Sequence, residues 1–258
     1  MCLQSFGYHG FHVNLYTYDP SIVTPPGVQR HDANDVIQAQ HVFRNYDQTG
    51  SYAAFSNLFR YALLQQVETV WIDTDILSTG QDFPDSEYLF GYESSTMING
   101  AVLAVPREST LLASLAAESA KLDPKIIRWG ELGPKLITKT INEVGLADQA
   151  QAREVFYPIE MKNAWRLFDP REIEWVHHEI SSACTVHLWN EMMRRATRSV
   201  KSMSPPAGSY LGEYCSILDL PIQKLETLDP SWARTVWKKS LDPSFSNRVV
   251  AKIRRTIR

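Results

Sequence analysis

Apolar side chains recur along this chain with two different periods, and the two periods predict both helices and strands. Between residues 51 and 66 apolar positions fall three and four residues apart, which predicts a helix with one core face. These positions are Phe55, Leu58, Phe59, Ala62 and Leu63. The segments 12–18, 87–93, 97–105 and 155–159 are rich in β-branched and aromatic residues, as strands are. The chain therefore has the mixed elements of an α/β protein.

The stretch 70–77, Val-Trp-Ile-Asp-Thr-Asp-Ile-Leu, is predicted to be a buried strand that carries two carboxylates. Side chains at positions i and i+2 of a strand point the same way, so we expect Asp73 and Asp75 to face one site. Two unpartnered carboxylates would repel each other, whereas Mn²⁺ or Mg²⁺ with phosphate oxygens would keep both ionised. We interpret the pair as a site for a metal ion and a diphosphate. Two solvated aspartates at the end of a strand are the alternative.

The predicted helix over 51–66 carries polar residues on the face opposite its apolar one. Ser56, Asn57 and Arg60 lie three and four residues apart, so they are neighbours on adjacent turns. Arg60 is expected to lie over the same site as the two aspartates.

This order of helix and strand resembles the DXD glycosyltransferases of the α-1,4-glycosyltransferase and capsular-polysaccharide group. The residues that carry the resemblance are Phe55-Ser56-Asn57-Leu58-Phe59-Arg60-Tyr61-Ala62-Leu63-Leu64 and Trp71-Ile72-Asp73-Thr74-Asp75. The resemblance implies a GT-A-like fold, a Rossmann-type mixed sheet flanked by helices. Related chains usually begin with one more strand, so we expect this chain to lack that first strand, as a fragment or through an unusual start.

Further matches to the family follow in order along the chain. The resemblance implies that Asn99, in Ile98-Asn99-Gly100, lies beside the donor sugar; a plain turn or bulge at Asn-Gly is the alternative. Gly133 and Pro134 match a Gly-Pro element near the family's active site; a helix over 134–143 that begins with Gly-Pro for capping alone is the alternative.

Two matches lie in the second half of the chain. In His187-Leu188-Trp189-Asn190 the resemblance implies that His187 lies near the metal and diphosphate and that Trp189 shields the site; a structural histidine is the alternative. Ser209 lies in a Pro- and Gly-rich segment, 205–211, that resembles a loop closing over the donor, and an ordinary surface loop is the alternative.

The function that the resemblance implies is metal-dependent transfer of a hexose from a nucleotide-diphosphate sugar, with a UDP-sugar expected, to a glycan or lipid-linked saccharide. Retention of anomeric configuration is implied as well. Asp73, Asp75 and Arg60 would be catalytic, Asp73, Asp75 and His187 would hold Mn²⁺ or Mg²⁺, and Arg60 with Asn99 would bind the sugar. The family has an aspartate where this chain has Asn57, whose amide can still bond hydroxyls.

Two other functions stay open at this point. A catalytically weak sugar-nucleotide or glycan-binding protein on the same fold is one of them. The other is a phosphatase of the haloacid-dehalogenase type, since an apolar strand followed by Asp-x-Asp also describes its nucleophile loop. Against the phosphatase, Leu77 stands where that family has a threonine, and the motif lies far from the N-terminus.

Composition bounds the remaining expectations. With 258 residues, 44% of them hydrophobic, we expect one domain over 1–246. A net charge of −3 argues against general nucleic-acid binding. Cys2, Cys184 and Cys215 lack metal-ligand spacing and suit a reducing cytosol.

A basic amphipathic tail over 247–258 ends the chain. Peripheral contact with anionic lipid at the inner face of the membrane is one expectation for it, and a solvated, frayed helix is the other.

Overall fold

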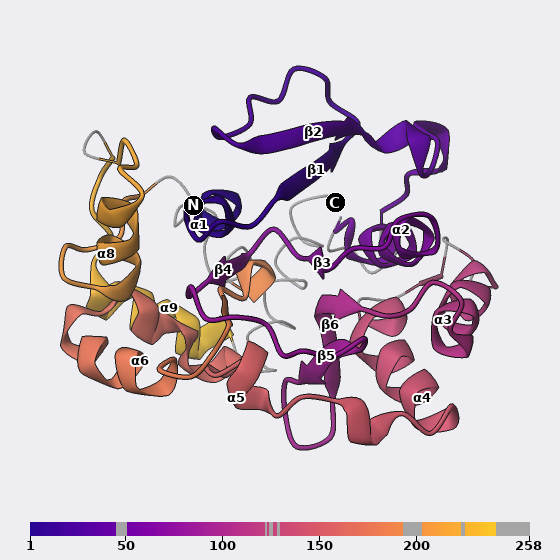
Figure 1. Cartoon of the computed structure of the whole chain (residues 1–258). Helices are drawn as coiled ribbons and strands as arrows, with labels where there is room; N and C mark the ends of the chain where they lie inside the picture. Colours follow the sequence, from indigo (N-terminus) through magenta and orange to yellow (C-terminus); the bar gives the residue numbers. More distant parts are fainter. Residues whose placement is uncertain are drawn as a thin grey trace, which may run out of the picture.

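A computed structural model describes residues 1–44, 51–121, 123, 126–127, 130–192, 203–222 and 225–240 of the chain. Its described strands form three small sheets (Figure 1). In the first, β6 (Ile98–Ala104) is the middle strand and pairs antiparallel with β3 (Trp71–Ile72) and with β5 (Leu89–Tyr92). In the second, β4 (Ile76–Ser78) pairs antiparallel with β7 (Thr185–His187). The β5–β6 hairpin is the one that the sequence predicts over 87–105.

The third sheet is the parallel pair of β1 (Val13–Thr17) and β2 (Val28–Asp32). The alternating pattern over 12–18 predicts β1, whereas β2 is not predicted. In β2 the buried side chain is that of Val28, and the polar residues that follow it are more exposed. An edge strand of this kind carries little apolar signal.

The helices flank these sheets, and most belong to segments whose apolar residues recur at helical spacing. The α-helices are α1 (Cys2–Tyr8), α2 (Ala53–Gln66), α3 (Thr110–Ala120), α4 (Leu136–Glu143), α5 (Arg153–Phe156), α6 (Ile173–Glu179), α8 (Tyr210–Ile217) and α9 (Pro230–Ser240). Shorter 3₁₀ turns cover Ala33–Asp35, Ala39–His41, Ala147–Gln149, Met161–Phe168 and Pro170–Glu172, and a π turn covers Glu131–Lys135.

Helix α2 is buried on two sides, which fixes it firmly beside β3. Phe55, Phe59 and Leu63 pack with Ala33 and with the aromatic side chains of β1 and its flank. The other side of α2 packs on α3 and on the core that α3 and α4 share with β6. Because both sides are held, the polar residues of α2 between them have a fixed direction.

The helices gather in two groups, with α2, α3 and α4 on one side of the molecule and α6, α8 and α9 on the other (Figure 1). One apolar cluster joins α2, α3 and α4 to β5 and β6, and another joins α6, α8 and α9 to β7. A third cluster, which includes Phe6, Ile76, Val102 and Phe156, lies between α1, β4, β6 and α5. The strands therefore connect two helical regions that are distant in sequence.

The mixed α/β architecture is confirmed, and it is consistent with a GT-A-like fold. Two local predictions are wrong. The stretch 70–77 is not one strand, because a turn at residues 73–75 separates β3 from β4. The segment 155–159 is not a strand either: its first residues complete the single turn α5, since Phe156 and Tyr157 fill the core whatever their β propensity. The single domain over 1–246 stays a prediction, and the tail over 247–258 lies outside the described residues.

Candidate active site

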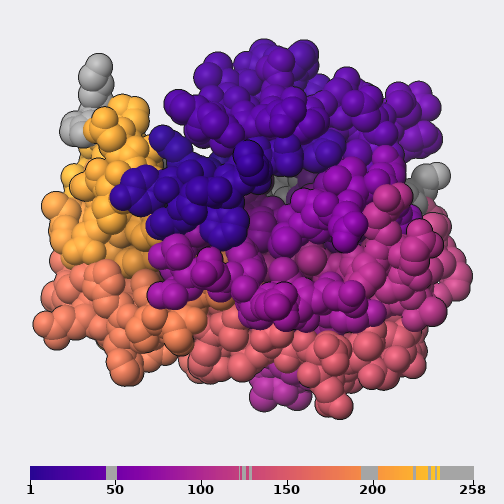
Figure 2. Space-filling model, in the orientation of Figure 1, coloured from indigo at the N-terminus to yellow at the C-terminus, as the bar shows by residue number. Residues whose placement is uncertain are grey.

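A large cavity of about 2020 Å³ lies beneath the β1–β2 layer, and Figure 2 shows this face of the molecule hollowed there. Ligand pockets are often of 300–1,000 Å³, so this one has room for more than one small molecule. Most of the residues that the sequence predicts for the site line it. They are Asn57, Arg60, Asp73, Asp75, Asn99, Pro134, His187 and Trp189.

The two aspartates lie where the chain passes from one sheet to another. The Asp73 N–H donates to the Ala101 carbonyl oxygen at 2.8 Å and so continues the pairing of β3 with β6. The Asp75 carbonyl oxygen accepts from the Leu188 N–H at 2.9 Å, which continues the pairing of β4 with β7. A bond from the Ile76 N–H to the Asp73 carbonyl oxygen, 3.1 Å long, closes the turn between them. Both carboxylates line one cavity, as predicted, but a turn brings them there and not strand alternation.

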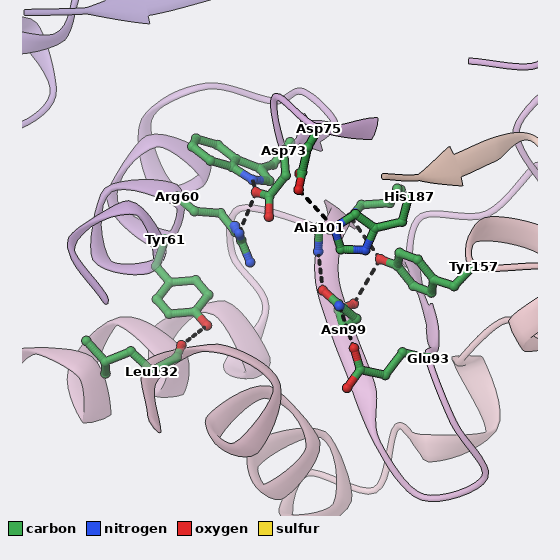
Figure 3. A network of polar contacts seen from close by, with 12 residues as sticks. Arg60, Tyr61, Asp73, Asp75, Glu93, Asn99, Ala101, Leu132, Tyr157 and His187 are labelled. Atoms are coloured by element: carbon green, nitrogen blue, oxygen red, sulfur yellow. Dashed lines mark hydrogen bonds and ion pairs between the residues drawn. The ribbon is translucent and has the colours of Figure 1, made fainter. Parts of the chain in front are cut away.

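Asp73 is held by Arg60 and by the indole of Trp71 (Figure 3). Arg60 Nη2 and Trp71 Nε1 each donate a hydrogen bond of 2.6 Å to Asp73 Oδ1. Arg60 is only 3% exposed, and its guanidinium lies over the Trp71 ring, 5.1 Å from the centroid. The positive charge of Arg60 is therefore fixed beside the aspartate turn, the turn at residues 73–75 that carries Asp73 and Asp75.

Gly100 explains how Arg60 reaches Asp73. A Cβ atom at position 100 would lie 2.5 Å from Arg60 Nη1 and 2.3 Å from Ile137 Cδ1. Asn99 and Gly100 are not a turn, because both lie within β6, but the pairing of β5 with β6 does shift register between Leu89 and Gly91, as a bulge would. The glycine leaves space for the arginine.

Asp75 forms a second polar pair, with His187 of β7. Asp75 Oδ2 lies 3.3 Å from His187 Nε2 and accepts from the Asn190 N–H at 2.9 Å. Burial raises the pKa of Asp75, but His187 and the Asn190 N–H outweigh burial, so the pKa is lowered overall. For His187, burial lowers the pKa, but the charge and hydrogen bond of Asp75, together with the charges of Asp73 and Glu93, outweigh burial and raise the pKa overall. The pair is thus stabilised in its charged form.

Trp189 fixes the histidine. Its ring stacks on that of His187, with centroids 4.1 Å apart and 27° between the planes, while its Nε1 donates to the Ile159 carbonyl oxygen at 2.9 Å. The backbone of Trp189 has a φ of 51°, the left-handed region that non-glycine residues rarely adopt. Strain of this kind persists where the surrounding contacts hold it in place.

The two carboxylates fit a divalent cation better than the histidine does. Asp73 Oδ2 and Asp75 Oδ1 accept no hydrogen bond from any other described residue, so both oxygens are available to a ligand. Mg²⁺ is often held by one or two carboxylates together with substrate phosphates. His187 directs Nε2 at Asp75, and its Nδ1 is buried with no partner among the described residues. Those residues contain no cluster of three or more His, Cys, Asp or Glu side chains suited to a metal.

Asn99 lies below the aspartates and is joined to Glu93, a residue that the sequence analysis missed (Figure 3). Asn99 Nδ2 donates to Glu93 Oε2 at 2.6 Å, and Asn99 Oδ1 accepts from the Ala101 N–H at 2.8 Å. Glu93 lines the same cavity, and burial raises the pKa of its carboxyl group. A lone glutamate beside a predicted hairpin gives no sequence signal of its own.

Gly133 and Pro134 lie at the side of the cavity next to α2. Pro134 lines it, whereas Gly133 is buried behind Asn57: a Cβ at position 133 would lie 3.1 Å from Asn57 Nδ2. The non-helical backbone at Gly133, with φ −97° and ψ −123°, interrupts the π turn that precedes α4. Gly133 thus bounds the position of Asn57 without facing the cavity.

Ser209 is not brought to the cavity. It is the N-cap of α8, where its Oγ accepts from the Gly212 N–H at 3.1 Å and donates to the Pro206 carbonyl oxygen at 2.6 Å. Its side chain is fully buried. Helix capping accounts for this serine, and the prediction that it binds the donor has no support in its position.

An α/β chain with buried ion pairs and perturbed carboxyl groups in one large cavity has the features of an enzyme active site. The family model described as the alpha 1,4-glycosyltransferase conserved region matches residues 124–218. This match supports an alpha-1,4-glycosyltransferase family and glycosyltransferase activity for the chain. No curated protein and no solved structure matches the chain. Within its described part, none of the helices has the length and apolar character needed to cross a membrane.

Proposed function

We propose that this chain transfers a hexose from a nucleotide-diphosphate sugar, with UDP-sugars as the first donors to test, to a glycan or lipid-linked saccharide. Mn²⁺ or Mg²⁺ is the proposed cofactor. The observation that carries the proposal is the meeting of Asp73 and Asp75 in one cavity, each with one carboxylate oxygen that has no partner among the described residues. Retention of anomeric configuration is proposed from the resemblance to the family.

The protein's own residues prepare the cavity for an anionic donor. Asp73 and Asp75 would hold the cation, which when bound supplies charge neutralisation for the leaving diphosphate. Arg60 adds a fixed, buried positive charge beside them. His187 orients Asp75 through the contact at 3.3 Å, so its proposed role is to position a ligand and not to be one.

The sugar would lie against the polar floor of the cavity that Asn57 and Asn99 form. Both amides are almost completely buried, so a hydroxyl bound to them would be shielded from water. Trp189 closes the cavity beside His187 and keeps water from the Asp75 side.

A catalytically weak binding protein is the second candidate function. It is favoured by the state of Asp73, one of whose oxygens already accepts two hydrogen bonds, from Arg60 and Trp71. The phosphatase is no longer a candidate, because the family match is to glycosyltransferases.

The test is turnover of labelled nucleotide sugars by the purified chain with Mn²⁺ and a mixture of glycan acceptors. Release of the nucleoside diphosphate together with label in a glycan is the expected result. Asp75→Asn should abolish it, while the exposed Asp85→Asn, in the loop between β4 and β5, should leave it unchanged. Donor binding without turnover would select the binding protein, and neither binding nor turnover would reject the proposal.

A further inference from the structure

The carboxylates that line the cavity differ in their partners. Asp73 faces Arg60, Asp75 faces His187, and the rim residue Glu154 faces Arg153. Glu93 is different: it forms no ion pair with any described residue, and its hydrogen-bond partner is the neutral amide of Asn99. A half-buried carboxylate without a cation is costly unless something uses it.

The position of Glu93 is fixed by the hairpin. It follows β5 directly, and its N–H donates to the Met97 carbonyl oxygen at 2.8 Å, which closes the turn to β6. Its Oε2 accepts from Asn99 at 2.6 Å, whereas its Oε1 has no hydrogen-bond partner among the described residues. One acceptor oxygen is therefore held in place at the cavity wall.

Glu93 also fixes which way the Asn99 amide points. An ionised carboxylate can only accept hydrogen bonds, so the NH₂ group of Asn99 must face it. The Ala101 N–H agrees, because it donates to the Asn99 oxygen at 2.8 Å. What remains for a ligand is one N–H of Asn99 beside one free oxygen of Glu93. A donor next to an acceptor matches a sugar hydroxyl, which both accepts and donates.

We propose that Glu93 is a sugar-binding residue, which accepts a hydrogen bond from a hydroxyl of the transferred hexose while Asn99 donates one to the same sugar. This inference rests on the proposed function. Glu93 lines the same cavity as Asp75 and His187, and Figure 3 shows it joined to Asn99 within the polar network of that cavity. A diphosphate held at the aspartates would carry its sugar into this part of the cavity (Figure 3).

The experiment compares UDP with UDP-glucose and UDP-galactose, by calorimetry in the presence of Mn²⁺. The difference in affinity between the sugar nucleotide and UDP isolates the contribution of the sugar. Glu93→Gln keeps the shape and can still accept from Asn99, but it turns an NH₂ group toward the ligand. It should lower the affinity for the preferred UDP-sugar by about 10- to 100-fold, as expected for a lost hydrogen bond to a charged group, and leave that for UDP unchanged.

Two further variants make the outcome specific. Glu154→Gln removes a carboxylate from the cavity rim, where it is paired with Arg153, and should change neither affinity. Glu93→Asp keeps the charge and should retain more of the sugar's contribution than Glu93→Gln does.

Each outcome decides between the two claims. Suppose that the wild type binds UDP and a UDP-sugar while Glu93→Gln lowers the affinities for both equally, or lowers neither affinity. In that case Glu93 does not bind the sugar, and the inference is wrong while the proposed function stands. If the wild type binds no nucleotide with Mn²⁺, the proposed function is overturned and this inference with it.

Discussion

Residues 53–105 and residues 124–218 contribute to the candidate site in different ways. The first region carries the two aspartates together with Arg60 and Glu93. The second carries the match to the glycosyltransferase family and contributes His187, Trp189 and the Asn190 N–H. The two regions meet at Asp75, which both pairs with His187 and accepts from Asn190.

The part that matches the family is therefore not the part that carries the aspartate pair and its buried arginine. Residues 124–218 mainly position the groups of the other region: Gly133 lies against Asn57, and β7 pairs with β4 beside the aspartate turn. Site geometry therefore depends on contacts between the regions, and variants at those contacts test the account.

The largest effect on stability is expected for Gly100→Ala, within the first region. The new methyl group would overlap Ile137 and Arg60, and overpacking of this kind costs about 1–3 kcal/mol of unfolding free energy. Displacement of Arg60 should also weaken donor binding. Urea denaturation and calorimetry measure the two effects.

Gly7→Ala is the matched control for that variant. A Cβ at position 7, in α1, would meet no atom within 4 Å, so this change should be neutral or stabilise by up to about 1 kcal/mol. Equal stability of the two alanine variants would contradict the close approach of Gly100 to Arg60.

The second prediction concerns the contact between the regions, and it is a pH dependence. The raised pKa of His187 means that its contribution to stability is fully present below the ordinary value of 6.5 and is lost as pH rises through the raised value. The lowered pKa of Asp75 gives a contribution present above 3.8 and lost as pH falls through the lowered value. In the metal-free protein, His187→Gln should therefore lower the free energy of unfolding most between pH 4 and 6.5, and should lower it less at higher pH.

Denaturant unfolding across this pH range measures the effect, with His178→Gln as a control on the exposed surface of α6. If the difference in unfolding free energy between wild type and His187→Gln grows above pH 7, the Asp75–His187 pair is not stabilised in its charged form.

The smallest effect is expected for Ser209→Ala, within the second region. Loss of the N-cap of α8 should cost about 1 kcal/mol of stability and leave donor affinity unchanged. Thermal unfolding and calorimetry check the two parts. A selective loss of donor affinity with normal stability would instead assign Ser209 to the substrate site.

The long periodic elements could be predicted from the sequence because their local pattern agrees with their burial. Helix α2 and the β5–β6 hairpin are examples. Strand β2 could not, since one buried valine gives no period. Helix α5 could not, since Val155 and Phe156 favour strands locally but complete a single helical turn. In these cases tertiary packing overrides propensity.

The residues of the candidate site likewise divide into those that could be predicted from the sequence and those that could not. Asp73, Asp75 and Arg60 could be found because they lie close together in a pattern of short spacing. Glu93 could not, because its relation to Asn99 appears only when the hairpin folds, and the role of Gly100 depends on a side chain 40 residues earlier. Ser209 shows the converse, since a sequence match does not tell a helix cap from a ligand contact.

The most direct test of the central claim is calorimetric binding of a panel of nucleotide sugars to the purified chain, with and without Mn²⁺. Asp75→Ala is the test variant, and Asp85→Ala, at an exposed position outside the cavity lining, is the control. We expect one donor to bind only with Mn²⁺, Asp75→Ala to abolish this binding, and Asp85→Ala to preserve it. Binding of a donor that needs neither Mn²⁺ nor Asp75 would contradict the proposed metal and donor site.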